Sequence, residues 1–453
     1  MSTERSDAHG GAWRAAGRAL AAVCALSSFA ACGGGGSSSS SPPVQMPTPT
    51  PTPSGSHKGP SAIKHVVIVI QENRSFDNLF YGFQGANYAT SGKGSAGQAI
   101  QLTPVSFADS FELCHDYGDA KLDIDGGKMD GFGHCLPDKA YTYVKGSETA
   151  PYFALARQYV LADDLFESQL DSSYEAHQYL IAAQAGMAIN IPNGTPWGCD
   201  SPPGSTVQLA NTQGQPVSRV FPCFTYTTLA DELNAKHLPW RYYAPASGNP
   251  AYIWSAYDAI KGIRDGPDWN ENVVSSQCRV LADAAAGTLP TVTWVVPDLS
   301  DSDHPLSLST TGPNWVTAVV NAIGSSSLWN STAIFVVWDD WGGFYDHVNP
   351  PISDWDGPGM RVPLIAISPY ARQGSVTHTQ YEFASVLRSV EDLFALAPMT
   401  ARDKAASDMW SDGAMFDFGQ APRKFSAFPD SGYSCNASET GPPDTDFGGP
   451  LQR

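Results

Sequence analysis

Two runs of β-branched and aromatic residues, each ending abruptly in a pair of oxygen-bearing side chains, constrain the fold of this chain most strongly. Residues 66–78 read VVIVIQENRSFDN, and residues 333–347 read AIFVVWDDWGGFYDH. Continuous apolar runs are typical of parallel strands that are covered on both faces, and the carboxyl ends of such strands open onto a ligand-binding crevice. The sequence therefore predicts an α/β fold in which both pairs meet at one edge of a central sheet. The pairs are Glu72 with Asn73 and Asp339 with Asp340.

The two pairs offer hard oxygen ligands, and all but the Asn73 amide are carboxylates. Such ligands suit Ca²⁺, Mg²⁺ or Mn²⁺ better than a metal selected by thiolates, so we expect one divalent ion, whose identity the sequence leaves open. The alternative is that each pair only caps the turn or helix that follows its strand. The chain has no CxxC spacing, so a cysteine metal site is not expected.

The charge of the chain argues against one class of partner. Its 453 residues include 45 acidic and 26 basic residues, which gives a formal net charge of −19. A surface of this sign repels nucleic acids and anionic membranes unless it carries a local basic patch. We therefore expect no nucleic-acid partner.

The N-terminus predicts an export signal. Arg14 and Arg18 precede ALAAVCALSSFAAC, an apolar stretch that is too short to span a bilayer but has the length of a signal-peptide core. We expect residues 1–31 to be removed. The sequence before Cys32 resembles a bacterial lipobox, although Phe29 stands where Leu is usual, so Cys32 would carry lipid and attach the protein to the outer membrane. The alternative is ordinary cleavage that leaves a periplasmic or secreted protein.

A tether is predicted to follow, because residues 32–60 are Gly/Ser-rich and then Pro/Thr-rich and contain too few apolar groups to fold. Beyond the leader and Cys32, an even number of cysteines remains, which predicts three disulfides in an exported chain. Short loops favour Cys114 with Cys135 and Cys199 with Cys223, but the sequence leaves the pairing open. The remaining cysteines are Cys114, Cys135, Cys199, Cys223, Cys278 and Cys435.

Several blocks of the sequence resemble one known family. The segment IKHVVIVIQENRSFDNLFYG is similar to the opening signature of the bacterial phosphoesterase family that contains the secreted phospholipases C and the respiratory-burst-inhibiting acid phosphatases. Further blocks follow in the order that the family shows, and together they cover nearly all of residues 61–430. They are GKMDGF at 127–132, PYFALARQYVLADDLFESQLDSSYEAHQYL at 151–180, TWVVPD at 293–298, DHP at 303–305, WDDWGGFYDHVNPP at 338–351 and RVPLIAISPYAR at 361–372.

The resemblance implies an alkaline-phosphatase-like three-layer sandwich with a central, mostly parallel sheet. It also implies one catalytic domain over residues 61–430, followed by a C-terminal tail over 431–453. The segments TVTWVVP and VPLIAISPY read as further buried strands, and TLADELNAKHL reads as an amphipathic helix that leads into the strand-like WRYYAP.

The nucleophile is expected in DSSYEAHQYLIAAQAG, where Ser173 precedes a helical stretch that ends at Gly186 and reads as its N-cap. A helix N-terminus stabilises negative charge and receives phosphate oxygens. Sequence alone does not separate Ser172 from Ser173, but the family motif G-P-[ST]-x-P-N aligns its nucleophile with Ser173. This chain departs from that motif at Asp171, Ser172, Glu175 and Ala176.

Two histidines lie in blocks that resemble the family's active-site segments. His115 precedes GKMDGF, and His304 lies in SDSDHPLS, a polar loop in which a core histidine is not expected. We expect both to bind phosphoryl oxygens or to move the proton that a leaving alkoxide needs. His347 could line the pocket or hold its own loop, and His177 is expected to pack beside the site.

The resulting prediction is a metal-dependent phosphoric ester hydrolase, similar to the acid phosphatases, that works through a phosphoserine on Ser173. A phospholipase C that releases phosphorylcholine is the alternative, for which an aromatic cage of Tyr117, Trp338 and Trp341 would bind choline. An inactive surface lipoprotein that binds lipid or a partner is an alternative of another class. Its signature would be the loss of the nucleophile or of a metal ligand.

Overall fold

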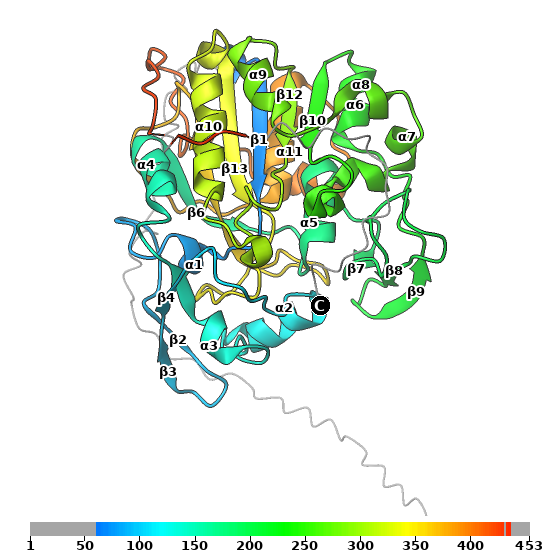
Figure 1. The fold of residues 1–453 in the computed structure, drawn as a ribbon, viewed down its shortest axis with the longest axis vertical. Coiled ribbons are helices and arrows are strands. Elements are labelled where there is room, and N and C mark those ends of the chain that lie inside the picture. The colour runs from blue at the N-terminus through cyan, green and yellow to red at the C-terminus, as the bar shows by residue number, and fades with distance from the viewer. Residues whose placement is uncertain (1–59, 430–431, 436–453) are drawn as a thin grey trace, which may run out of the picture. The chain divides into compact units, whose positions relative to one another are not determined.

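A nine-stranded mixed sheet forms the centre of the protein in the computed structural model, which describes residues 60–429 and 432–435 (Figure 1). The strands lie in the order β11-β10-β12-β1-β13-β14-β6-β15, and β16 also pairs with β6. The bounds are β11 Val273–Ser275, β10 Trp240–Ala244, β12 Val292–Val295, β1 His65–Gln71, β13 Thr332–Trp338, β14 Arg361–Ile367, β6 Val160–Phe166, β15 Ser375–Thr377 and β16 Tyr381–Glu382.

The two apolar runs singled out in the sequence are the adjacent central strands β1 and β13. They pair in parallel along their full length, from His65 opposite Thr332 to Gln71 opposite Trp338. Their side chains are buried except at His65, as expected for strands covered on both faces. The predicted α/β class with a mostly parallel sheet is thus confirmed. The exception in the middle is β14, which runs antiparallel to both β13 and β6.

Helices cover both faces of the sheet. In Figure 1, α10 (Gly312–Gly324) lies in front of the central strands and α11 (Phe383–Phe394) lies behind them. The α10 sequence places Trp315, Val319 and Ile323 four residues apart, which forms an apolar stripe that is fully buried. The other helices are α1 Phe76–Leu79, α2 Tyr117–Ile124, α3 Pro137–Ala140, α4 Ala150–Gln158, α5 Ser173–Ala182, α6 Leu229–Ala235, α7 Lys261–Arg264, α8 Asp268–Asn272, α9 Arg279–Ala285 and α12 Ala401–Ala405.

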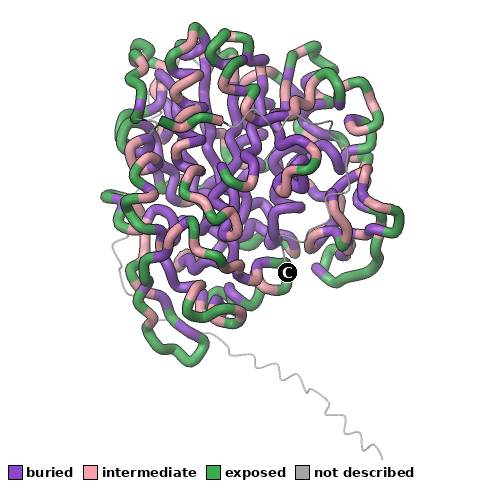
Figure 2. The backbone as a smooth tube through the Cα atoms, viewed as in Figure 1, coloured by how far each residue is buried: buried purple, intermediate pink, exposed green. Residues whose placement is uncertain are grey.

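Smaller sheets extend the end of the molecule that also carries α2 and α3 (Figure 1). Figure 2 shows that burial is greatest in the central strands and lowest in the peripheral loops. The small sheets are β2 Ser91–Lys93 with β3 Ala99–Gln101, β4 Thr103–Val105 with β5 Thr142–Val144, and β7 Ala188–Ile189 with β8 Val207–Ala210 and β9 Pro216–Val220.

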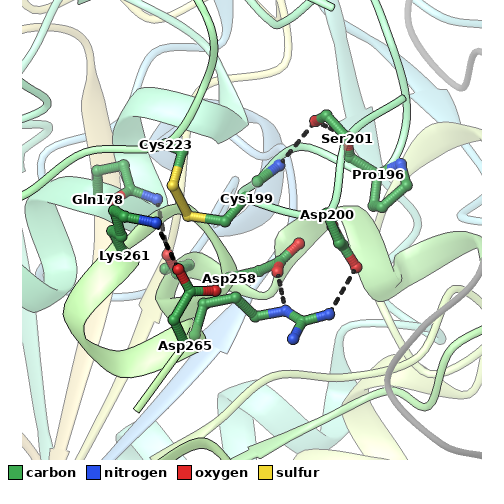
Figure 3. Close-up of a disulfide and its surroundings, with 12 residues drawn as sticks. Gln178, Pro196, Cys199, Asp200, Ser201, Cys223, Asp258, Lys261 and Asp265 are labelled. Atoms are coloured by element: carbon green, nitrogen blue, oxygen red, sulfur yellow. Dashed lines mark hydrogen bonds and ion pairs between the residues drawn. A yellow bond between two sulfur atoms is a disulfide. The ribbon is translucent and has the colours of Figure 1, made fainter. Parts of the chain in front are cut away.

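Three disulfides pair the six cysteines of the predicted set, as expected. Cys114 joins Cys135, Cys199 joins Cys223, and Cys278 joins Cys435. Figure 3 shows the second of these beside Gln178 of α5 and Asp258. The backbone N–H of Cys199 donates to the Asp258 carbonyl, and the Gln178 amide donates to the Ala256 carbonyl. The loop that this disulfide closes and helix α5 therefore both contact one segment, residues 256–258.

Expectations for the chain ends fall largely outside the described residues. The signal peptide, Cys32 and nearly all of the tether lie in 1–59, and most of the predicted tail lies in 436–453. Within the part of the chain that the structure describes, no helix has both the length and the apolar character needed to cross a membrane.

Candidate active site

The carboxyl ends of β1 and β13 bring the two predicted pairs together. The Asn73 backbone N–H donates to Asp339 Oδ1 at 2.8 Å, and Asn73 Nδ2 lies 3.4 Å from Asp340 Oδ2. All these side chains, including Glu72, are completely buried. Parallel pairing of the two strands explains the contact, because it places their carboxyl ends at the same edge of the sheet.

The turn after Asp340 fits closely against Asn73. Asn73 has a φ of 54°, in the left-handed region that asparagine tolerates better than most residues. The Gly342 N–H donates to Asp340 Oδ1 at 2.7 Å, and Gly342 has a φ of +61°. A Cβ on Gly342 would lie 2.6 Å from the Asn73 carbonyl oxygen, so glycine is required for this approach.

Ser173 is the first residue of α5 rather than its N-cap, which corrects the sequence prediction. The N-cap is Ser172, which has an extended backbone and makes no capping hydrogen bond through its side chain. The Ser173 Oγ donates to Asp340 Oδ2 at 3.0 Å. The helix also ends earlier than predicted, at Ala182, because Ala183 adopts a left-handed conformation.

His177 belongs to the centre of the site, although the sequence placed it only beside it. Its Nε2 lies 2.9 Å from Glu72 Oε1 and 3.6 Å from Asp339 Oδ2. The signal that could have found it is spacing, since His177 follows Ser173 by four residues and so shares its face of α5. Glu72, His177 and Asp339 offer ligand atoms that all lie within 4.8 Å of one another.

The three carboxylates repel one another strongly. Burial raises the pKa of Glu72 well above its usual value, and the nearby charge of Asp339 adds to the effect. Burial and the charge of Asp339 act in the same way on the pKa of Asp340. Burial also opposes ionisation of Asp339, but the nearby imidazole of His177 lowers the pKa of that carboxyl below its usual range. The cluster therefore sets three carboxylates against a single imidazole, that of His177.

A divalent cation would supply the positive charge that the three carboxylates need. Among the described residues, no arginine or lysine forms an ion pair with these carboxylates. Three buried oxygens in the cluster have no hydrogen-bond partner, and buried polar atoms of this kind are rare unless they bind a ligand. They are Glu72 Oε2, Asn73 Oδ1 and Asp339 Oδ2. The imidazole of His177 widens the range of suitable metals beyond the three ions favoured by oxygen ligands alone.

His115 contacts the metal-site candidates through Asn73. The Asn73 amide nitrogen lies 3.0 Å from His115 Nε2, and His115 Nδ1 lies 2.7 Å from the Leu113 carbonyl oxygen. An amide nitrogen can only donate, so Nε2 accepts and the ring proton is on Nδ1. This contact turns the orphaned Asn73 Oδ1 away from His115 and leaves it for a cation.

His304 is completely buried, and its Nε2 lies 3.6 Å from Glu112 Oε1. Its Nδ1 accepts from the Leu306 N–H at 3.2 Å, so the ring proton is on Nε2. Burial lowers the pKa of His304 to about 3. The ring is therefore neutral, and Nε2 presents an N–H that has no hydrogen-bond acceptor among the described residues.

A cavity of about 340 Å³ opens beside these groups. The sequence did not single out Glu112, which lies in its wall three residues before His115. The polar residues of the wall are Glu112, His115, Asp116, Asp119, Ser172 and Asn190.

His347 and the three rings of the predicted aromatic cage are held in contacts of their own. His347 Nδ1 lies 2.7 Å from Asp77 Oδ2, so this histidine holds its own loop. The cage prediction is wrong for these three rings. The buried indoles of Trp338 and Trp341 donate to Asp303 and Asp123. The Tyr117 ring is already covered by the Lys121 ammonium, 4.0 Å from its centroid.

Comparison with protein families shows to which family the chain belongs. The model of the phosphoesterase family matches residues 63–397, which include every residue of the site described above. The chain belongs to the phosphoesterase family. The resemblance found in the sequence blocks is thereby confirmed.

Relatives of this phosphoesterase include phospholipases C from bacteria and plants. The hemolytic phospholipase C of Pseudomonas aeruginosa is 25% identical over 401 residues, which are 74% of this chain and 53% of the relative. Phospholipase C A of Mycobacterium tuberculosis is 25% identical, and the match covers 80% of this chain and 78% of the relative. The non-specific phospholipase C6 of Arabidopsis thaliana is 26% identical, over 78% of this chain and 72% of the relative. The chain spans about half the length of its Pseudomonas aeruginosa relatives.

Solved structures match this phosphoesterase more weakly. A protein in the alkaline phosphatase superfamily from Vibrio parahaemolyticus is 12% identical, covers 76% of this chain and 69% of that chain, and gives a TM-score of 0.37. Murine ectonucleotide pyrophosphatase/phosphodiesterase 5 is 8% identical, covers 76% and 100%, and gives a TM-score of 0.36. Scores of this size carry no argument about the site.

Proposed function

We propose that this phosphoesterase hydrolyses phosphate esters through a phosphoserine on Ser173. The observation that carries the proposal is the hydrogen bond from Ser173 Oγ to Asp340 Oδ2, at the edge of a buried carboxylate cluster that no arginine or lysine of the described residues pairs with. A serine at the first turn of a helix can receive phosphoryl oxygens on the backbone N–H groups of that helix. The same hydroxyl is already oriented by its carboxylate partner.

The metal ion would lie between the strand ends and α5. The residues that would hold it are Glu72, Asn73, Asp339 and Asp340, with His177 as a further ligand or as the donor that orients Glu72. When bound, a divalent ion supplies Lewis-acid stabilisation of the serine oxygen and of the phosphoryl charge. His115 positions the Asn73 amide, and His304 offers its Nε2–H to a phosphoryl oxygen.

Two classes of ester remain candidates. The relatives are phospholipases C, which favours an enzyme that cleaves a phospholipid between diacylglycerol and the phosphorylated head group. The acid phosphatase similarity of the sequence blocks favours simple phosphate monoesters. A choline head group would need contacts other than the three rings first considered, because those rings are engaged elsewhere.

Export belongs to the same proposal. Three disulfides fit a chain that folds in an oxidising compartment. We propose that residues 1–31 direct export, that Cys32 carries lipid, and that the tether over 32–60 holds the catalytic domain over 61–430 near the outer membrane.

The test compares nitrophenyl phosphate with nitrophenyl phosphorylcholine as substrates of the exported protein, with and without chelator. We expect Ser173→Ala to lower kcat by about 10⁴-fold or more, while Ser172→Ala retains most of the activity. The preferred ester separates a phosphatase from a phospholipase C. Equal rates in wild type and Ser173→Ala would rule out Ser173 as the nucleophile. Intact esters across pH and added metals would favour the inactive binding protein.

A further inference from the structure

Glu112 stands out as a carboxyl group at the site that the proposed steps leave without a role. It lies in the wall of the cavity of about 340 Å³, together with His115 and Ser172, the residue before the nucleophile. Its side chain is only 11% exposed. Glu112 Oε1 has no hydrogen-bond partner among the described residues, although a buried carboxyl oxygen normally has one.

The neighbour of this orphaned oxygen is the orphaned N–H of His304. His304 Nε2 and Glu112 Oε1 lie 3.6 Å apart, which is too long for a hydrogen bond. The contact is not an ion pair at neutral pH either, because His304 is neutral. Two unsatisfied polar atoms thus face the same point, where an oxygen of a substrate could contact both.

Glu112 is suited to hold a proton near neutral pH. Burial raises the pKa of Glu112 to about 7, the positive charge of protonated His115 would lower it, and Asp340 raises it. Much of the carboxyl is therefore protonated at neutral pH, which suits a general acid. The charged or titratable groups around Glu112 are His115, His304 and Asp340, with Asp116 and Asp119 in the same cavity wall.

We infer that Glu112 is a further catalytic residue, the general acid that protonates the leaving alcohol, and that the cavity beside it receives that alcohol. The inference rests on the proposed phosphoserine mechanism. The inference adds to that mechanism a class of substrate, the alkyl esters of phosphate. Their leaving groups are strongly basic alkoxides, which leave slowly unless they are protonated.

The two half-reactions balance. In the first, a bond forms from Ser173 Oγ to phosphorus as the bond from phosphorus to the alcohol oxygen breaks. The Glu112 proton goes to that oxygen, and the serine proton goes to the Asp340 carboxylate that already accepts its hydrogen bond. In the second, water attacks phosphorus as the bond to Ser173 breaks. The water proton goes to solvent, Ser173 recovers its proton from Asp340, and Glu112 regains its proton from solvent before the next turnover.

The test is a comparison of leaving groups in the full chain. Nitrophenolate leaves without protonation, so Glu112→Gln should change kcat on nitrophenyl phosphorylcholine and nitrophenyl phosphate by less than about 10-fold. On dihexanoyl phosphatidylcholine and glycerol phosphate, which release alkoxides, we expect a loss of about 10²-fold or more. For wild type, activity on the alkyl ester should fall as pH rises through about 7, while Glu112→Gln should lack this limb.

Asp119→Asn is the matched control, because it removes one carboxyl charge from the same cavity wall. Asp119→Asn should change kcat on the aryl esters and kcat on the alkyl esters by the same factor. An equal loss on both esters in Glu112→Gln, with unaltered thermal unfolding, would overturn the role as an acid, and so would full activity on the alkyl esters. Failure of the wider mechanism looks different: Ser173→Ala would then keep its activity on both esters.

Discussion

The same two segments of the chain build two groups of buried carboxylates, and the two groups solve the charge problem in different ways. The site cluster contains Glu72, Asp339 and Asp340 with His177. The arginine cluster lies a few residues further along both segments and contains Asp77, Asp346, His347 and Arg361.

Arg361 supplies the arginine cluster with a buried positive charge. Its guanidinium donates to Asp346 at 3.0 Å and to Asp77 at 3.2 Å. Every carboxylate oxygen of the two aspartates accepts at least one hydrogen bond, from Arg361, from His347 or from a backbone N–H. In the site cluster, by contrast, oxygens remain orphaned and no arginine or lysine of the described residues compensates them. The supply of positive charge, more than the number of acids, therefore distinguishes a candidate metal site from a structural ion-pair network.

The largest effect should follow from removing one acid of each cluster in turn. Asp339→Asn takes away a candidate ligand, so we expect kcat to fall by about 10³-fold or more and the metal-induced rise in unfolding temperature to disappear. Asp346→Asn should keep both the activity and the metal response, although it lowers stability. Enzyme assays measure the activity, and thermal unfolding with added Ca²⁺, Mg²⁺, Mn²⁺ or Zn²⁺ measures the metal response. If added metal still raised the unfolding temperature of Asp339→Asn, the proposed difference between the two clusters would be wrong.

A smaller effect, on stability alone, should follow from Arg361→Met. This change leaves Asp77 and Asp346 buried without their counterion, so we expect the free energy of unfolding to fall by about 3 kcal/mol. Urea denaturation measures the loss, and adding Asp346→Asn to Arg361→Met should restore part of it. If Arg361→Met were as stable as wild type, the arginine would not be the compensating charge.

The smallest effect concerns a third group, in which an imidazolium supplies the charge. A hydrogen bond to Asp123 raises the pKa of His134 to about 9, against an opposing effect of partial burial. The pKa is raised on folding from about 6.5, so the stabilisation is complete below pH 6.5 and is lost as the pH rises through about 9. It should amount to less than about 1 kcal/mol because the ring is partly exposed. Urea denaturation at pH 6, 8 and 10 should show this slope in wild type and not in His134→Gln.

The sequence by itself determined the strands and the strand-end acids. The apolar runs of β1 and β13 predict buried parallel strands, and the polar residues at their carboxyl ends predict a site. Both patterns can be recognised because they involve residues that are close together in the chain. Ser173 could also be placed at a helix start from residue types alone, although the N-cap was assigned one residue too late.

Only the tertiary structure decided which of these groups meet and how their charges are compensated. His177 contacts Glu72, and Glu112 faces His304, through packing between segments that are distant in the sequence. The sequence shows Asp77 and Asp346 as acids no different in kind from Asp339, and only the approach of Arg361 from β14 separates them. Electrostatic compensation depends on distances of a few ångströms across the fold, and residue order does not encode those distances locally.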